Sequence, residues 1–174
     1  NQGYHFVQWS DGNTDNPRTI VLTQDTTLTA EFAITQSGQC GDNLYWNLID
    51  DTLHITGTGA MYDYTYYDAP WKRSIKALCI GESVTSIGYE AFSGCSSLTS
   101  VTIPNSVTYI GDYAFYGCYS LPVEDNLRYA DTYLVEAVDK TLSTYSIKEG
   151  TKWIGSSAFS SCSSLTTITI PNSV

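Results

Sequence analysis

Two histidines are the first residues to consider for catalysis or metal binding. His5 and His54 lie in the strand-like runs GYHFVQW and DTLHITG, and neither has a second His or Cys at metal-ligand spacing. The sequence also contains no P-loop, no GxGxxG turn and no GxSxG nucleophile elbow. We therefore expect both histidines to be ordinary strand residues, and we predict neither a metal nor a cofactor.

The acidic motif DGNTDN at residues 11–16 begins like a calcium-binding loop. Its sixth position is Asn16 where such a loop has Gly, and its twelfth is Leu22 where the loop has a bidentate Glu. A turn is therefore the preferred interpretation.

Adjacent carboxylates could in principle act as a glycosidase pair. The candidates are Asp50 with Asp51 and Glu124 with Asp125. Neighbours in a strand point to opposite faces, and nothing in the sequence places a second carboxylate opposite either pair. The sequence therefore favours a protein that is not an enzyme.

Five cysteines leave two interpretations open. Cys95, Cys118 and Cys162 recur at one repeated position, where a buried thiol acting as a compact apolar group is favoured over a disulfide. Cys40 and Cys79 flank the segment that precedes the repeats. They could form a disulfide across that segment or remain free thiols. No histidine is patterned beside either of them, so neither is expected to be catalytic.

The charge of the chain limits its partners. Eight Lys and Arg against eighteen Asp and Glu give a net charge of −10, the wrong sign for nucleic acid or an anionic membrane surface. No apolar run approaches the roughly 18 residues of a membrane span. Residues 1–71 hold nine acids and one base, whereas residues 72–174 hold nine acids and seven bases. This shift near Trp71 indicates a change of module.

A repeat of 23 residues organises the second part of the chain. Residues 80–102 (IGESVTSIGYEAFSGCSSLTSVT), 103–121 (IPNSVTYIGDYAFYGCYSL) and 147–169 (IKEGTKWIGSSAFSSCSSLTTIT) align without gaps. A short repeat cannot close its own core, so successive coils must stack their apolar columns into a solenoid. The predicted core is Ile87, Phe92, Cys95, Leu98, Ile110, Phe115, Cys118, Leu121, Ile154, Phe159, Cys162 and Leu165.

Within one unit, LTSVTI places Leu98, Val101 and Ile103 on the inward side of a β-rich segment, and AFxxC is expected to be a turn of helix. The Gly after each Ile of the IG pair suits positive φ or a close backbone approach.

The unit IPxSVTxIGxxAFxxCxSLTxVT resembles the BspA-type leucine-rich repeat of bacterial surface proteins. The resemblance implies a mainly β, right-handed leucine-rich-repeat solenoid of β-strands with short helical turns. It also implies a secreted or cell-surface protein that binds host or matrix proteins and is not an enzyme. The coils would lie at 80–102, 103–146 and 147–169, with a truncated unit at 170–174.

Residues 127–147 interrupt the period. Their alternation predicts a β-hairpin inserted between coils, with strands at 132–137 and 142–147 and a turn at VDKT.

The first 79 residues are expected to hold two smaller elements. Residues 1–35 resemble the second half of an internalin-type B repeat, a small β module, with strand-like runs on either side of DGNTDNP and the second run reading TIVLTQ and then TTLTAEF. Residues 36–79 read as β-hairpins that cap the open end of the solenoid. Because the chain stops at IPNSV, a copy of residues 103–107, we expect it to be part of a longer protein.

Positions that vary between repeats indicate where a ligand could bind. Tyr113 and Tyr116 of the second unit replace Glu90 and Ser93 of the first, and exposed aromatic side chains are enriched in binding interfaces. The full candidate set is Tyr109, Tyr113, Tyr116, Tyr119 and Trp153. These rings could instead cover the solenoid flank or pack under the insertion. The tyrosines of MYDYTYYDAPW (61–71) are assigned to the cap.

The resemblance thus implies a surface protein that recognises a host or matrix protein through the solenoid, and the lack of catalytic motifs agrees with a protein that is not an enzyme. Two alternatives stay open. A carbohydrate-binding surface would show coplanar exposed aromatics beside Asp or Asn. A passive spacer presenting another domain would show no distinctive patch.

Overall fold

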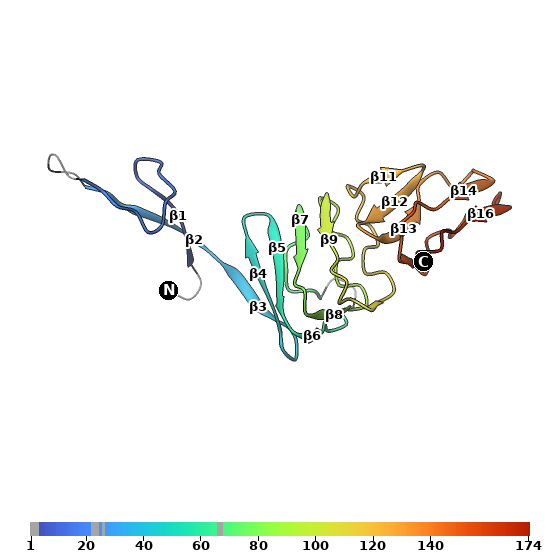
Figure 1. Ribbon diagram of the computed structural model, residues 1–174, viewed down its shortest axis with the longest axis horizontal. Coiled ribbons are helices and arrows are strands. Elements are labelled where there is room, and N and C mark those ends of the chain that lie inside the picture. Colours follow the sequence, from blue (N-terminus) through green and yellow to red (C-terminus); the bar gives the residue numbers. More distant parts are fainter. Residues whose placement is uncertain (1–3, 22–24, 26, 66–67) are drawn as a thin grey trace. The chain divides into compact units, whose positions relative to one another are not determined.

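The computed structural model describes residues 4–21, 25, 27–65 and 68–174 as β-strands joined by turns, with no helix in those ranges (Figure 1). The chain divides into two compact units, Asn1–Ser37 and Gly38–Val174.

Unit 1 contains one antiparallel pair of strands. β1 (Tyr4–Trp9) pairs with β2 (Ala30–Ile34), and Phe6 lies opposite Phe32 with the ring centroids 6.0 Å apart. Residues 19–21 of the predicted strand TIVLTQ have no strand partner, so that prediction is wrong for them; its residues 22–24 lie outside the described residues. The resemblance of this unit to an internalin-type B repeat stays a prediction.

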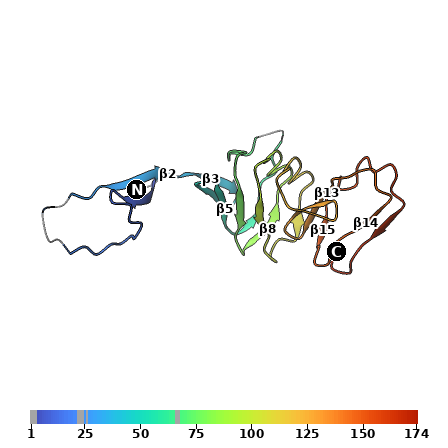
Figure 2. The same cartoon turned by 90° about the horizontal axis from the view of Figure 1, so that it is seen from above.

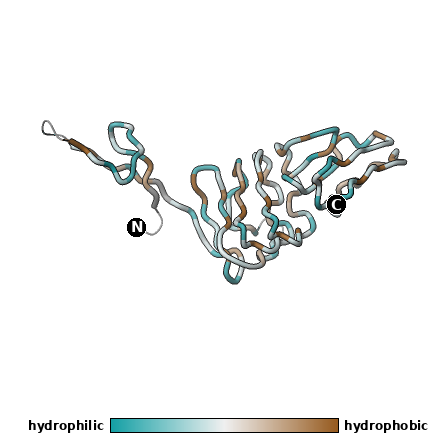
Figure 3. The backbone as a smooth tube through the Cα atoms, in the orientation of Figure 1, coloured by the Kyte–Doolittle hydropathy of each residue, from teal (hydrophilic) through white to brown (hydrophobic). Residues whose placement is uncertain are grey.

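Unit 2 is built on a five-stranded sheet with the order β3-β4-β5-β7-β9. The strands are β3 (Gln36–Gly41), β4 (Leu44–Ile49), β5 (Thr52–Gly57), β7 (Ala77–Ile80) and β9 (Ser100–Thr102). β4 and β5 form an antiparallel hairpin, whereas β5, β7 and β9 run parallel. The predicted cap therefore extends the main sheet by its edge, and Leu44, Trp46 and Leu48 are the buried residues that alternate along β4. Figure 3 shows hydrophobic and hydrophilic stretches along the strands of this unit.

A second sheet with the order β10-β8-β6 runs along another side of the stack. Its strands are β6 (Gly59–Ala60), β8 (Val84–Ile87) and β10 (Tyr109–Ile110), all parallel. Figure 2 shows the coils following one another from β5 to β15. The backbone N–H groups of Thr99, Thr108 and Thr166 donate to carbonyls 23 residues earlier, at 2.8, 2.9 and 2.8 Å. The sequence period is thus one step of a hydrogen-bonded solenoid.

The AFxxC step is a chain of tight turns, and the helical turn expected there is absent. In coil 80–102, Ser93 N–H donates to the Glu90 carbonyl at 3.0 Å and Cys95 N–H to the Phe92 carbonyl at 3.1 Å, both three residues back. Alternate N–H groups point to the next coil instead, with Phe92 donating to the Ala114 carbonyl at 2.8 Å. A helix would use these groups internally, so bonding between coils takes precedence over local helix formation.

Stacked aromatic rings form the centre of the core. The repeated Phe92 and Phe115 lie 5.4 Å apart at 23°, and Trp71 continues the stack at 5.3 Å and 27° from Phe92. At the other end, Tyr133 lies 5.7 Å from Phe115 at 50°. Trp71 and Tyr133 thus extend the phenylalanine column into neighbouring coils that lack the repeat motif.

The predicted core columns are buried in the first two coils. Ile87, Phe92, Cys95, Leu98, Phe115, Cys118 and Leu121 are all buried, and Ile110 is half-buried against them. In coil 147–169 the matching side chains Ile154, Phe159, Cys162 and Leu165 are half-buried. An inner coil is covered on two sides and this outer coil on one, so equal sequence positions differ in burial.

Both strands of the predicted inserted hairpin are present, as β13 (Tyr133–Ala137) and β14 (Thr144–Ser146), but their predicted pairing with each other is wrong. β12 (Leu127–Ala130) pairs antiparallel with β13 (Tyr133–Ala137), and β11 (Val123–Glu124) pairs with β12. β14 (Thr144–Ser146) runs parallel to β16 (Thr167–Thr169) and makes no pair with β13.

Residues 127–146 instead form a divergent coil of the solenoid. Leu134 is in register with Ile154 of β15 (Trp153–Ile154), and the Ser143 carbonyl accepts from Thr166 N–H. Leu134 and Leu142 therefore occupy the columns of Ile154 and Leu165 without the repeat sequence around them. Such a coil is not detected from the motif because only its apolar columns are retained.

Close backbone approach explains the glycine after each repeated isoleucine. A Cβ atom at Gly111 would lie 2.4 Å from Tyr89 N and 2.7 Å from the Gly88 carbonyl carbon. Gly111→Ala is therefore expected to push two coils apart and lower the free energy of unfolding by about 2 kcal/mol or more, measured by urea unfolding. Gly150→Ala is the control, because an added methyl group there meets nothing within 4 Å. The only expected penalty is the positive φ of 84°, which costs a residue with a Cβ atom about 1 kcal/mol. Equal losses would contradict this explanation.

Candidate functional site

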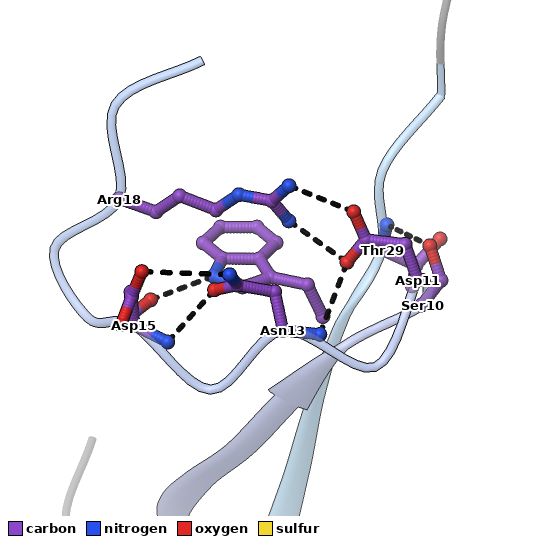
Figure 4. A network of polar contacts seen from close by, with 7 residues as sticks. Ser10, Asp11, Asn13, Asp15, Arg18 and Thr29 are labelled. Atoms are coloured by element: carbon purple, nitrogen blue, oxygen red, sulfur yellow. Dashed lines mark hydrogen bonds and ion pairs between the residues drawn. The ribbon is translucent and has the colours of Figure 1, made fainter.

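The DGNTDN motif forms a turn, as predicted, and the structure adds an ion pair that holds it (Figure 4). Arg18 donates to both carboxylate oxygens of Asp11 at 2.8 and 2.7 Å. Asp11 also accepts from Asn13 N–H, and the Asn13 side chain accepts from Asp15 N–H at 2.8 Å. The Arg18 guanidinium holds the pKa of Asp11 below its usual value. The acidic side chains are thus used to shape the loop.

The two carboxylate pairs considered for glycoside hydrolysis lie at hairpin turns and are partly ion-paired. Asp51 contacts Lys72 and Lys76, each at 2.9 Å, and these bonds lower its pKa to about 2. Glu124 lies 3.4 Å from Lys148 Nζ. Within the described ranges, no group of three or more His, Cys, Asp or Glu is placed to hold a metal ion.

The main sheet brings a histidine beside a cysteine, which the sequence did not indicate. His54 on β5 is in register with Cys79 on β7, and Asn47 on β4 lies on the other side of His54. No sequence pattern placed a histidine next to Cys79, and the strand register brings one there. The two residues become neighbours only through the parallel pairing of β5 with β7. That pairing belongs to the tertiary structure and has no local sequence signal. His5 lies on β1, and its side chain is outside the described residues.

All five cysteines are free thiols in the structure. Cys95 and Cys118 are buried in the repeat column, and Cys162 is half-buried. Burial raises the pKa of Cys95 to about 12 and that of Cys40 to about 11, and it raises the pKa of Cys118 further still. These thiols stay protonated and unreactive at neutral pH.

Alkylation provides a test of this arrangement. In the native protein, iodoacetamide at pH 8 is expected to modify the exposed Cys79 at least tenfold faster than Cys95 or Cys118, because the thiolate is the reacting species. Peptide mass spectrometry over a time course measures the rates, and the urea-unfolded protein, with all five sites reactive, is the control. Early modification of Cys118 would show that the column is not buried.

Four of the five candidate aromatic residues are exposed. The exposed fractions of Tyr109, Tyr113, Tyr116 and Tyr119 are 61, 40, 56 and 61%. Trp153 is half-buried against the core, with Lys152 Nζ 5.8 Å from its ring centroid. In the predicted cap, Trp71 is buried, Tyr64 is half-buried and Tyr62 is exposed, whereas Tyr66 and Tyr67 lie outside the described residues.

The structure brings only part of the candidate set together. Tyr113 contacts Tyr116 at 5.9 Å and Tyr89 of the preceding coil at 6.0 Å, with ring planes at 89° and 87°. We call Tyr89, Tyr113 and Tyr116 the tyrosine cluster. No ring contact joins Tyr109 or Tyr119 to it in the described part of the chain. Tyr89 was not among the predicted residues. It directly precedes an acidic residue of the first unit and lies in a variable column of the repeat.

A pocket of about 360 Å³ opens beside the tyrosine cluster. Tyr113 and Tyr116 line it from one coil and serines line it from the coil 147–169, and we call these two parts the tyrosine wall and the serine wall. The two walls meet where Ser157 Oγ lies 3.5 Å from Tyr113 Oη. The lining residues are Tyr113, Phe115, Tyr116, Tyr133, Val135, Glu136, Lys140, Gly155, Ser156, Ser157, Ser160 and Ser161. We call it the tyrosine–serine pocket.

A buried arginine holds the divergent coil against the coil that carries the tyrosines. Arg128 Nε donates to Glu136 at 3.1 Å, and its Nη1 donates to the carbonyls of Tyr119 and Leu121, the latter at 2.9 Å. Arg128 thereby neutralises Glu136 within the pocket lining. Arg128 could not be predicted from the sequence, because a single arginine in an irregular segment carries no repeat signal.

Comparison with known proteins supports the repeat interpretation. Residues 61–174 match the model of the BspA type leucine rich repeat region, in six copies. No curated protein matches the sequence. Within the described ranges, no helix is long and apolar enough to cross a bilayer.

Several solved bacterial structures are similar to this chain. A leucine-rich repeat protein from Eubacterium ventriosum is 21% identical with a TM-score of 0.40, covering 82% of this chain and 61% of that one. A leucine rich cell surface protein from Faecalibacterium prausnitzii is 24% identical with a TM-score of 0.40, covering 82% and 44%. This chain thus spans less than two thirds of either relative. The family model matches six repeat copies over residues 61–174, and the coils of the structure hydrogen-bond at the same 23-residue step. The chain therefore belongs to the BspA-type leucine-rich repeat family.

Proposed function

We propose that this chain is a non-enzymatic binding segment of a secreted or cell-surface bacterial protein, and that it recognises a host or matrix protein through the tyrosine cluster. The observation that carries this proposal is the exposure of Tyr113 and Tyr116 at positions where other coils have Ser or Glu. Exposed tyrosines supply a large contact area at a low cost in conformational entropy. A passive spacer would not need them.

The geometry of the rings favours a protein partner over a flat sugar-binding platform. Neighbouring rings of the tyrosine cluster are nearly perpendicular, at 87° and 89°, so they present edges and faces in alternation. A platform for sugar rings along the coils would need coplanar faces. Residues 72–174 carry nearly balanced charge, which leaves contact area as the main contribution to affinity.

Surface plasmon resonance on immobilised fibronectin, laminin and collagen tests the proposal. The variant Tyr113→Ser/Tyr116→Ser copies the serines of the coil 147–169 and is expected to weaken binding about thirtyfold or more, as hot-spot loss does. Tyr109→Ser/Tyr119→Ser removes two equally exposed rings outside the cluster and is the matched control, with an expected change of less than about threefold. The proposal fails if none of the three proteins binds, or if both variants bind like the parent chain.

A further inference from the structure

The tyrosine–serine pocket exists because the divergent coil is short. Eleven positions separate Ile154 from Leu165, and the first two coils have the same spacing, whereas eight separate Leu134 from Leu142. The register of Leu134 with Ile154 and the bond from Thr166 N–H to Ser143 show that these are matching positions. The missing residues are those of the AFxxC turn.

The short turn leaves a hollow where a ring would otherwise pack. Ala137 N–H donates to the Ala158 carbonyl at 2.7 Å, as Phe92 N–H does to Ala114, so Ala137 takes the place of the repeated phenylalanine. The aromatic stack therefore ends at Tyr133, which closes the pocket floor together with Phe115. Gly155 keeps that floor accessible, because a Cβ atom there would lie 2.9 Å from the Tyr133 hydroxyl.

The two walls offer complementary chemistry. Tyr113 and Tyr116 contribute aromatic surface, and the serine wall contains Ser156, Ser157, Ser160 and Ser161, whose hydroxyls can each donate and accept. A pyranose ring has the same division, with an apolar C–H face and an edge of hydroxyl groups. The volume of about 360 Å³ is within the range of small-molecule sites.

One positive charge in the pocket is uncompensated. Glu136 is paired with Arg128, whereas Lys140 has no ion-pair partner among the described residues. An anionic group on the ligand would neutralise the ammonium group of Lys140. An acidic amino-acid side chain could reach Lys140 but would leave the serine wall without hydrogen-bond partners, whereas a sugar that bears a carboxylate uses both.

We infer that the tyrosine–serine pocket binds a carboxylated sugar residue. Its ring packs on the face of a single tyrosine, because the rings of Tyr113 and Tyr116 stand at 89° to each other. Its hydroxyls bond to the serine wall, and its carboxylate pairs with Lys140. This site shares Tyr113 and Tyr116 with the proposed protein interface, but it also needs Lys140 and the serines, which that interface does not use.

Titration with D-glucuronate and D-glucose, which differ in a carboxylate, tests the inference on the full chain by two-dimensional NMR. Glucuronate is expected to shift the amide signals of residues 155–161, with glucose binding about tenfold more weakly, the effect of one charge-assisted hydrogen bond. Lys140→Gln is expected to abolish this preference. Lys76→Gln, which removes an exposed lysine away from the pocket, is the matched control and should preserve it.

Several results would overturn the inference. The inference fails if neither sugar shifts the pocket signals, if both sugars bind equally, or if the preference for glucuronate survives in Lys140→Gln. N-acetylglutamate amide is the third ligand in the series, and its binding in preference to glucuronate would show that the pocket accepts a protein side chain instead. Protein binding that persists in Lys140→Gln leaves the proposed function intact, so the two ideas fail separately.

Discussion

Phe115→Ala is expected to lower the free energy of unfolding of unit 2 by about 3–5 kcal/mol, the cost of a cavity left by a fully buried ring. Phe115 is buried, stacks on Phe92 and contacts Tyr133, so its loss interrupts the aromatic stack in the middle. Urea unfolding followed by tryptophan fluorescence measures the loss, because Trp46 and Trp71 lie in the same core.

Phe159→Ala is the matched control for this prediction. Phe159 occupies the same repeat column but is half-buried and contacts Tyr145 instead of another phenylalanine. We expect Phe159→Ala to lower the free energy of unfolding by about half as much as Phe115→Ala, because folding buries less apolar surface at Phe159. Equal losses in the two variants would mean that the repeat column alone, and not its position in the stack, decides stability.

Arg128→Ala is expected to cost about 3–5 kcal/mol, because breaking a buried ion pair leaves the other charge without a partner. The side chains of Arg128 and Glu136 are only 11 and 22% exposed. The carbonyls of Tyr119 and Leu121 would also lose their donor. The same urea experiment gives the magnitude. The double variant Arg128→Ala/Glu136→Ala is expected to recover part of the loss, since it no longer leaves a carboxylate unpaired.

An exposed ion pair in the same unit is the control for the arginine. Lys72→Ala removes a partner of Asp51, but the two side chains are 39 and 40% exposed. A surface pair of this kind contributes less than about 1 kcal/mol. If Arg128→Ala were no more destabilising than Lys72→Ala, the divergent coil would be held in place by its apolar columns alone.

Much of the candidate site could not be predicted because it lies between coils. The exposure of Tyr113 and Tyr116 follows from comparing repeats, since positions that vary are free of the core. Their contact with Tyr89 and the serine wall opposite depend on which coils are neighbours and how closely they approach. Trp153 shows the limit of the comparison, because it occupies a variable column yet is half-buried against the core.

The amino-acid sequence alone determined the 23-residue period, the inward columns of Ile, Phe, Cys and Leu, and the family. It could do so because every coil stacks on a near copy of itself, so one pattern of burial serves all of them. Only the tertiary structure showed that residues 127–146 are a coil, that Trp71 and Tyr133 extend the phenylalanine stack, and that Arg128 and the tyrosine–serine pocket lie beside the tyrosines. In that region each residue packs against an unlike neighbour, so its environment depends on contacts that no local pattern specifies.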